Sequence, residues 1–374
     1  MVIRVTYILL LSLLFGCVSV SESETEMSTN HPQYPVEVSY AKYFSIDTID
    51  GFQRIKVIDP VTQQGQYFWL VPKGMNPELN GVIISTPVDD LSLFSVSFIG
   101  FLEQLDALSN VKYIENINYV YNEEIIQRYN MGIVKESGIF GQMDLEKLIL
   151  DAPELLLLND FPESSNYLNK LLKAEVSYLP IVEWQEEEPL ARAEWIKVIG
   201  ALLDKEKIAD SVFQEIEKNY LDIKSKCSID GGSVKVIFSS LYEGVWYMPG
   251  GKSYIANLLT DANGRFEWSN NNEVGSIAVS FEEVLLNSSK NDVWINPDAD
   301  SKNELVGRDG RYQVLIDSLT LGVFQANARK NQKGGNDYWE SGVVRPDLIL
   351  SDYAKMLHPK KFEEIEFYFF QELE

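Results

Sequence analysis

Short apolar runs alternate with amphipathic segments along most of the chain. After residue 81, the runs "GVIIST", "VKYIE", "ELLLL" and "LPIVEW" are separated by segments of helical spacing near residues 91–109, from residue 144 and near residues 165–173. Strands that are apolar without alternation are typical of a parallel sheet that helices cover on both faces. This rhythm predicts a first α/β lobe.

Residues 43–71 show a different pattern. They alternate between apolar and polar positions on both sides of the turn "DPVTQQGQ". Period-two alternation around a turn predicts a β-hairpin. We therefore expect the N-terminal lobe to begin with this hairpin.

A long helix is predicted after the first lobe. Over residues 205–226, the apolar residues Ile208, Val212, Ile216 and Tyr220 recur on one stripe, and charged residues occupy the other positions. Such a helix makes more than about five turns and is too stiff to be a loose linker. We expect it to act as a strut between two lobes.

The strand and helix rhythm resumes after this helix. It predicts strands at "VKVIFSSL", "DVWIN" and "LGVFQANA", and helices that begin at Ser253, Ser280 and Pro346 and near residues 311–318. The predicted fold class is α/β, with two Rossmann-like lobes of mostly parallel sheets joined by one long backbone α-helix. The predicted domains are residues 36–187 for the N-terminal lobe with its hairpin, 188–230 for the interlobe helical segment and 231–374 for the C-terminal lobe.

The first 35 residues are typical of export and anchoring. The stretch "MVIRVTYILLLSLLFGC" has a cationic residue, Arg4, and then an apolar run that is too short and too early for a stable membrane span. Residues 1–16 are predicted to be a signal peptide, and residues 17–35, rich in Ser, Glu and Thr, a flexible tether. The sequence Leu14-Phe15-Gly16-Cys17 resembles the lipobox of bacterial lipoproteins, which implies a lipid anchor on Cys17. The alternative is a plain signal peptide with an incidental cysteine.

Composition narrows the function. The chain has 374 residues and a net charge of −24, which disfavours a nucleic-acid partner because phosphate backbones repel such a surface. If Cys17 is lipidated, Cys227 has no partner for a disulfide within the chain. Because His31 and His358 are the only histidines, we expect no metal site made by the protein, no cofactor and no Ser-His-Asp catalytic site.

Two matching segments occur, one in each half of the chain. "MDLEKLILDAPELLLL" and "VSFEEVLLNSSKNDVWI" each place a capping residue, Asp144 or Ser280, two positions before a glutamate, Glu146 or Glu282. Both glutamates are thus expected in the first turn of a helix, and Ser280 forms a capping box with the acid that follows Glu282. Helix dipoles alone would favour these acids by roughly a few tenths of a kcal/mol. The recurrence at matching places suggests a shared role on one outer surface.

The order of lipobox, tether, α/β lobe, long helix and α/β lobe resembles the substrate-binding lipoproteins of ABC importers for iron chelates and cobalamin. The likeness extends from about residue 82 to residue 358, and the two matching segments are similar to those that carry permease-docking glutamates in that family. The resemblance implies that Glu146 and Glu282 contact the transmembrane subunits of an ABC permease with a cytoplasmic ATPase. It also implies a monomeric, non-enzymatic lipoprotein, exported by a bacterium and held on the periplasmic side of the cytoplasmic membrane.

Aromatic residues are the first candidates for ligand contacts, because ligands of parallel sheets bind outside the carboxyl ends of the strands. Trp246, Tyr247 and Trp339 lie in glycine-rich polar loops and suit stacking against a large flat ligand. The alternative is that these rings pack against neighbouring protein. Thr86 and Phe140 are the expected contacts from the first lobe.

Charged residues are the second candidates. Lys252 and Arg345 add cations and Glu340 an anion, a mixed set that could hold a carboxylate-rich or catecholate ferric complex. The alternative is a salt bridge between Arg345 and Glu340. No catalytic residue and no protein ligand to a metal is expected in either set.

A ferric siderophore is the expected ligand. Ser276 occupies the place where cobalamin-binding members of the family carry a stacking tryptophan, and Phe140 occupies its counterpart in the first lobe. The resemblance therefore favours an iron chelate, with cobalamin or haem as alternatives. A chelatase-like enzyme and a ligand-storage lipoprotein are alternatives from other classes, because fold does not fix function.

Overall fold

The computed structural model describes residues 35–138, 150, 153–159, 173, 176–228, 233–288 and 291–374. The chain separates into a unit of residues 1–33 and a unit from Tyr34 to Glu374, and the description below concerns the second unit. Outside the described residues lie the predicted signal peptide, Cys17, nearly all of the tether, Phe140, Glu146 and nearly all of the helices predicted from residue 144 and near residues 165–173. No helix in the described ranges combines the length and the apolar character that a membrane span requires.

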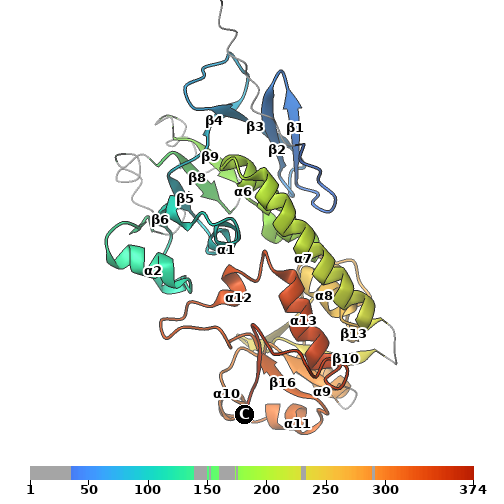
Figure 1. The fold of residues 1–374 in the computed structure, drawn as a ribbon. Helices are drawn as coiled ribbons and strands as arrows, with labels where there is room; N and C mark the ends of the chain where they lie inside the picture. Colours follow the sequence, from blue (N-terminus) through green and yellow to red (C-terminus); the bar gives the residue numbers. More distant parts are fainter. Residues whose placement is uncertain are drawn as a thin grey trace, which may run out of the picture. The chain divides into compact units, whose positions relative to one another are not determined.

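Four strands precede the first lobe (Figure 1). Strands β1 (Phe44–Ile49), β2 (Phe52–Ile58) and β3 (Gly65–Pro72) are antiparallel, which confirms the hairpin predicted over residues 43–71. Strand β4 (Val82–Thr86) pairs with β3 in parallel. The prediction that "GVIIST" belongs to the lobe sheet is therefore wrong. It forms the edge of this separate sheet, where its first two residues are only half-buried.

The first lobe is built on a five-stranded sheet in the order β7-β6-β5-β8-β9, with every pair parallel. The strands are β5 (Leu91–Leu93), β6 (Val111–Ile114), β7 (Lys135–Glu136), β8 (Leu155–Leu158) and β9 (Tyr178–Pro180). All residues of β5 and β8 are buried, as their continuous apolar runs predict.

The helix predicted near residues 91–109 is shorter than expected. Its first three residues form β5 at the centre of the sheet, and the helix α1 occupies only Ser97–Gln104. A second helix, α2 (Glu123–Asn130), was not predicted. It is capped by Asn122, whose side chain accepts a hydrogen bond from the Ile125 N–H.

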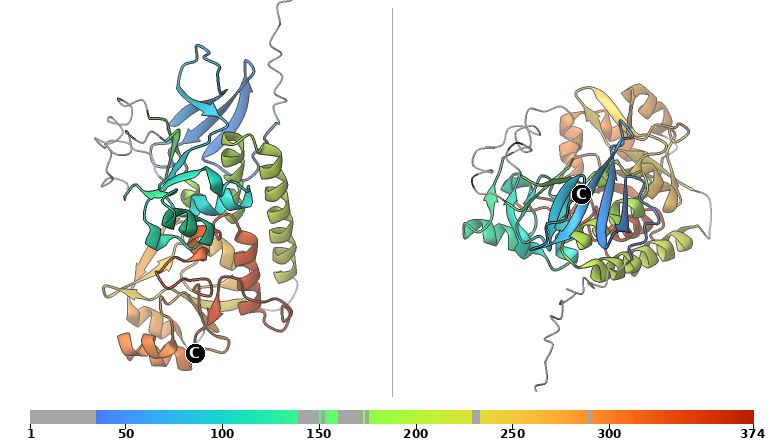
Figure 2. Two further views of the ribbon diagram at one scale, coloured as in Figure 1. Left: turned by 60° about the vertical axis from the view of Figure 1, so that its left-hand side comes forward. Right: turned by 90° about the horizontal axis from the view of Figure 1, so that it is seen from above.

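Helices connect the two lobes, as predicted. After α5 (Pro189–Glu194) and α6 (Ile196–Leu202), the helix α7 (Glu206–Cys227) runs for 22 residues and packs against α6 near its start and against α13 (Pro346–Leu357) farther along (Figure 2). Its buried face agrees with the predicted stripe at Ile216 and Tyr220 and is shifted by one residue in the first half of the helix. Ala209 and Phe213 are buried, whereas Ile208 is 47% exposed.

The second lobe repeats the design of the first. Its five-stranded sheet has the order β13-β10-β15-β16-β17, and only the last pair is antiparallel. The strands are β10 (Val234–Phe238), β13 (Gly264–Arg265), β15 (Val293–Ile295), β16 (Gly322–Gln325) and β17 (Gln371–Glu372). The helices are α8 (Tyr254–Asp261), α9 (Phe281–Ser288), α10 (Lys302–Arg308), α11 (Tyr312–Asp317), α12 (Asp337–Glu340) and α13. The two lobes, their mostly parallel sheets and the long connecting helix confirm the predicted fold class.

A small antiparallel sheet in the second lobe was not predicted. It consists of β11 (Leu241–Tyr242), β12 (Val245–Pro249) and β14 (Ser276–Val279), and the first two lie in the glycine-rich segment that was predicted to be a loop. Along β12, alternate side chains face opposite sides, so that neighbouring residues have different surroundings. This alternation decides which of its aromatic residues can meet a ligand.

Candidate functional site

A large pocket opens between the two lobes, with a volume of about 1020 Å³. Its lining comes from the carboxyl ends of both parallel sheets, where ligands of such sheets are expected to bind. In the first lobe these are Ser95 after β5, Asn159 after β8 and Glu183 after β9; in the second, Ser239 after β10, Asn296 after β15 and Asn327 after β16. The two sheets thus converge on one site.

Three exposed aromatic residues line the pocket: Trp184, Tyr247 and Trp339, which are 49%, 42% and 62% exposed. All seven tryptophans of the chain lie in the described residues, and Trp184 and Trp339 are the two that are exposed. Tyr247 and Trp339 were predicted, but Trp184 was not. Its position directly after the buried run "LPIVE" was the available signal, because that is the carboxyl end of a strand.

Trp246 is a core residue and not a ligand contact, which corrects the prediction. It is fully buried, its indole N–H donates to the Phe238 carbonyl oxygen at 2.8 Å, and its ring lies against those of Phe281, Trp294 and Tyr312. Strand alternation is the reason, since Trp246 faces the core and Tyr247 the pocket. For Trp246, the alternative of packing against neighbouring protein was the correct one.

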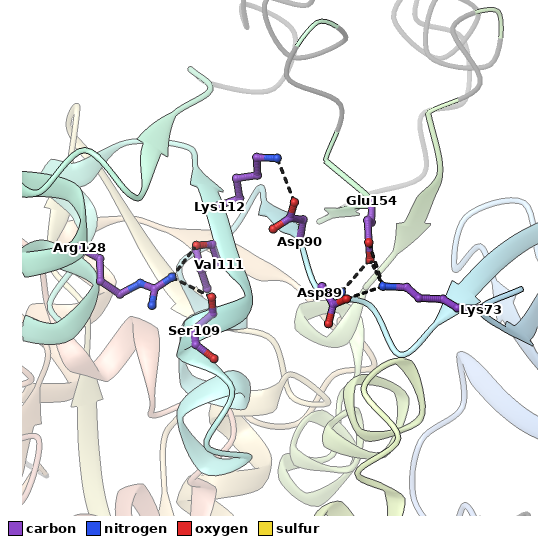
Figure 3. A network of polar contacts seen from close by, with 8 residues as sticks. All are labelled: Lys73, Asp89, Asp90, Ser109, Val111, Lys112, Arg128 and Glu154. Atoms are coloured by element: carbon purple, nitrogen blue, oxygen red, sulfur yellow. Dashed lines mark hydrogen bonds and ion pairs between the residues drawn. The ribbon is translucent and has the colours of Figure 1, made fainter. Parts of the chain in front are cut away.

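Thr86 does not line the pocket either. It ends β4, and its carbonyl oxygen accepts from the Lys73 N–H at the junction between the N-terminal sheet and the first lobe. Figure 3 shows this junction, where Lys73 Nζ lies 2.6 Å from Asp89 and 2.9 Å from Glu154. Asp89 lies two residues before β5 and Glu154 directly before β8, so the junction is at the amino ends of these strands, opposite the pocket.

Two predicted cations also lie outside the pocket lining. Lys252 is exposed to solvent. Arg345 forms a two-pronged pair with Asp347, at 2.8 Å from Nε and 2.7 Å from Nη2. Arg345 therefore pairs with the acid two residues on, and neither a ligand role nor the alternative pair with Glu340 fits this geometry.

Glu340 bridges the lobes instead of lining the pocket. It is 1% exposed on α12 of the second lobe, and its two carboxylate oxygens accept the backbone N–H groups of Tyr121 and Asn122 in the first lobe at 2.7 and 2.9 Å. Burial raises its pKa to about 8. Gly100 allows this close contact, because a Cβ there would come within 2.3 Å of the Glu340 carbonyl oxygen. We call this contact the interlobe latch.

Glu183 is the buried acid of the pocket wall. It is 1% exposed, and Ser97 of α1 donates to its Oε1 at 2.6 Å, while its Oε2 has no hydrogen-bond partner. Burial raises its pKa to about 7, against the opposing effects of the Ser97 hydrogen bond, the charge of Arg192 and the backbone N–H groups of Glu183 and Trp184. Arg192 lies 3.8 Å from the centre of the Tyr254 ring, and burial lowers the pKa of its guanidinium group.

The second-lobe wall of the pocket carries a network of ion pairs. Arg308 contacts Glu304 at 2.5 Å, and Lys330 lies 3.4 Å from Asp300. The Asn327 side-chain amide also donates to Asp300 at 2.8 Å. Among the described residues, no group of three or more His, Cys, Asp and Glu side chains is arranged to hold a metal ion.

Glu282 lies where the sequence predicts it, in the first turn of α9, with its side chain 74% exposed. The predicted capping box is present, since the Glu283 N–H donates to the Ser280 hydroxyl at 3.2 Å and the Ser280 N–H donates to Glu283 at 2.9 Å. These hydrogen bonds lower the pKa of Glu283. Arg311 approaches Glu282 at 3.6 Å.

Comparison with known proteins agrees with this architecture. Residues 106–309, more than half of the chain, match the family model described as periplasmic binding protein. An uncharacterized lipoprotein of Methanocaldococcus jannaschii, MJ0878, is 23% identical over 98% of this chain and 95% of its own length.

Solved structures share the fold. A Helicobacter pylori protein, CeuE, crystallised as a nickel-histidine complex, has a TM-score of 0.57 and 14% identity over 84% of this chain and 91% of its own. A possible iron-binding periplasmic solute-binding protein of Staphylococcus epidermidis has a TM-score of 0.55 and 16% identity over 73% of this chain and 100% of its own. At these identities the likeness concerns the fold.

Proposed function

The chain belongs to the periplasmic binding protein family, and on that premise we propose that it is the substrate-binding component of an ABC importer. It captures a ferric siderophore between its two lobes and delivers it to the permease. Cobalamin and haem are the alternative ligands for the same role. The observation that carries the proposal is the interlobe pocket with three exposed aromatic residues at the carboxyl ends of both sheets.

The pocket suits a bulky ligand. Its volume of about 1020 Å³ is at the upper end of the range for small-molecule sites, roughly 300–1,000 Å³. Trp184 comes from the first lobe, and Tyr247 and Trp339 from the second, so a flat or rounded ligand can be held from both sides. Exposed aromatic rings lose little side-chain entropy when a ligand covers them, which favours binding.

Delivery requires a docking surface. We propose Glu282, together with Glu146 of the first lobe, as the contacts to arginines of the permease. The high exposure of Glu282 supports this role, because a charge with its side chain 74% exposed is available to a partner. Complementary charges of this kind orient the docked complex and speed its formation more than they add affinity.

The proposed location is the outer side of the cytoplasmic membrane, with a lipid on Cys17 as the anchor and residues 18–35 as the tether. The name of the M. jannaschii relative, a lipoprotein that aligns with 98% of this chain, supports an anchored form. Lipids at Cys17 would hold the protein at the membrane that contains the permease, with or without a bound ligand.

The test is a fluorescence titration of the full chain in mild detergent with ferric siderophores, cobalamin and haem. Saturable quenching by a ferric siderophore is expected, with loss of most of the quenching in Trp184→Phe combined with Trp339→Phe. Trp69→Phe is the matched control, because this tryptophan lies in the N-terminal sheet outside the pocket lining. Absence of binding by all of these compounds would overturn the transport function and favour the storage or chelatase-like alternatives.

A further inference from the structure

Glu183 differs from the other buried acids of the described chain. Each of the others accepts hydrogen bonds from backbone N–H groups or forms an ion pair with an arginine: Asp59, Glu186, Glu194, Asp337, Glu340, Asp347 and Asp352. The Ser97 hydroxyl donates to Oε1 of Glu183, and the backbone N–H groups of Glu183 and Trp184 also lower its pKa, but its Oε2 has no hydrogen-bond partner, unlike the carboxylate oxygens of the other acids in this set. A buried carboxylate oxygen without a hydrogen-bond donor costs free energy, unless a bound molecule supplies the donor. Because Glu183 lines the pocket, a ligand can do so.

The charged residues around Glu183 do not provide a partner for its second carboxylate oxygen. No described cation lies within ion-pair distance of its carboxylate; the nearest charge that affects it is Arg192. The guanidinium group of Arg192 is already engaged, since its Nε donates to the Glu186 carbonyl oxygen at 2.9 Å and its Nη2 to the Trp184 carbonyl oxygen at 2.5 Å. Its face lies over the Tyr254 ring. Arg192 is therefore poorly placed to bind an anionic ligand.

The described lining as a whole has more carboxylates than cationic side chains. The pocket holds four carboxylates, Glu183, Asp298, Asp300 and Glu304, against three cations, Arg192, Arg308 and Lys330. Arg308 and Lys330 are already paired with Glu304 and Asp300. The Oδ1 of Asn327 is a second buried acceptor without a partner. The two buried side-chain atoms of the described lining that have no partner, Glu183 Oε2 and Asn327 Oδ1, are thus both hydrogen-bond acceptors.

We propose that the pocket selects chelates that carry a positive charge or N–H donors, and that Glu183 is the residue that senses this charge. The inference rests on the proposed function and narrows its ligand class. Lys252 and Arg345, the cations that favoured a carboxylate-rich or catecholate complex, lie outside the pocket lining. A polyanionic chelate would instead meet an acidic pocket on a chain with a net charge of −24, which repels it at long range.

The proposal makes ligand binding depend on pH. Facing Glu183 are Ser97 of α1 and Arg192 of α5, and behind Arg192 lies Tyr254 of α8. With a pKa of about 7, Glu183 is mostly protonated below that pH and mostly charged above it. A cationic ligand stabilises the charged form, so binding releases a proton at low pH. Affinity for a cationic chelate should rise with pH and level off above about 7.

The experiment compares two ligands that share one iron cage. Ferrioxamine B is a ferric trihydroxamate with a free ammonium group, and its N-acetylated form lacks that charge. The full chain is titrated with each at pH about 6 and about 8. At the higher pH, ferrioxamine B should bind about tenfold tighter than the acetylated form, equivalent to about 1.4 kcal/mol. At the lower pH, the ratio should fall to about two or less.

Variants assign the effect to Glu183. Glu183→Gln should bring the ratio to near one at both pH values, whereas Glu364→Gln, which removes the same charge from an exposed site outside the lining, should leave it unchanged. Ser97→Ala should move the pH midpoint upward, because the Ser97 hydrogen bond lowers the pKa of Glu183. This second variant keeps the carboxylate and so tests the same group without removing it.

The outcomes separate this inference from the proposed function. Equal affinity for the two ferrioxamines, or tighter binding of a trianionic ferric catecholate, would overturn the charge selection while leaving chelate transport intact. A ratio that Glu183→Gln does not change would overturn the role of Glu183. Binding of no chelate of any charge would overturn both the proposed function and the inference that rests on it.

Discussion

Glu183 and Glu340 are two buried glutamates that differ in their hydrogen-bond partners. Each is 1% exposed, and burial raises the pKa of each, to about 7 and about 8. Glu340 receives two backbone N–H groups from the other lobe, whereas Glu183 has an oxygen without a partner. The protein thus supplies hydrogen-bond donors to both oxygens of Glu340, but to only one oxygen of Glu183 at the pocket wall.

The comparison assigns different tasks to the two acids. The interlobe latch fixes the second lobe against residues 121 and 122 of the first, a contact that limits how far the lobes can part on that side. The hydrogen bond that the Glu183 carboxylate accepts from Ser97 comes from its own lobe. Loss of Glu340 should therefore affect stability, and loss of Glu183 should affect ligand choice.

Glu340→Ala should give the largest effect. It leaves the backbone N–H groups of Tyr121 and Asn122 without their acceptors in a buried place, a loss of about 2–4 kcal/mol in the free energy of unfolding. Urea denaturation measures it. Glu340→Gln keeps one acceptor oxygen and should lose about half as much. A change below about 0.5 kcal/mol in Glu340→Ala would mean that the latch does not hold the lobes together.

The pH dependence of stability should be the next largest effect. An acid whose pKa is raised from 4.5 to about 8 on folding keeps its proton in the folded chain at pH values where the unfolded chain has released it. The free energy of unfolding should therefore fall as pH rises from about 5 to about 8, by roughly 1 kcal/mol or more from Glu340. The difference between wild type and Glu340→Gln at each pH isolates this contribution. A difference that does not vary with pH would contradict the raised pKa.

The large features of the fold could be predicted because they depend on local periodicity. The helix predicted over residues 205–226 occurs as α7, since a run of helical spacing needs no distant partner to be recognised. Its buried face was predicted correctly at Ile216 and Tyr220 and misplaced at the start, because the predicted stripe repeats every four residues, whereas a helix turns every 3.6 residues. Such a stripe drifts around the helix, and Ile208 at its start falls on the exposed side.

Strand pairing and side-chain direction were harder to predict. "GVIIST" has the composition of a lobe strand, and only its pairing with β3 places it in another sheet. In "GVWYMPGG" the flanking glycines suggested a loop, which hid the alternation that buries Trp246 and exposes Tyr247. Recognising a strand here would have predicted both outcomes.

The two buried glutamates show the limit of sequence reasoning at the site. Glu340 was predicted to contact a ligand, and this prediction was wrong. Its partners are backbone N–H groups 218 and 219 residues away, and no pattern of side chains in the sequence reveals such partners. Glu183 follows a buried strand at its carboxyl end, a place that the rule for parallel sheets marks for ligands. That rule was applied to the longer glycine-rich loops and not to the short segment "VEW".

Glu183→Gln should give the smallest change in stability and thereby complete the comparison. At pH above about 7 the wild-type chain holds a buried, half-satisfied charge, and glutamine of nearly the same shape removes it while keeping an acceptor for the Ser97 hydroxyl. The free energy of unfolding should change by less than about 1 kcal/mol, in the stabilising direction. A loss as large as that of Glu340→Ala would show that Glu183 supports the fold as Glu340 does. The open oxygen would then be a structural feature, and its assignment to a ligand would lose its basis.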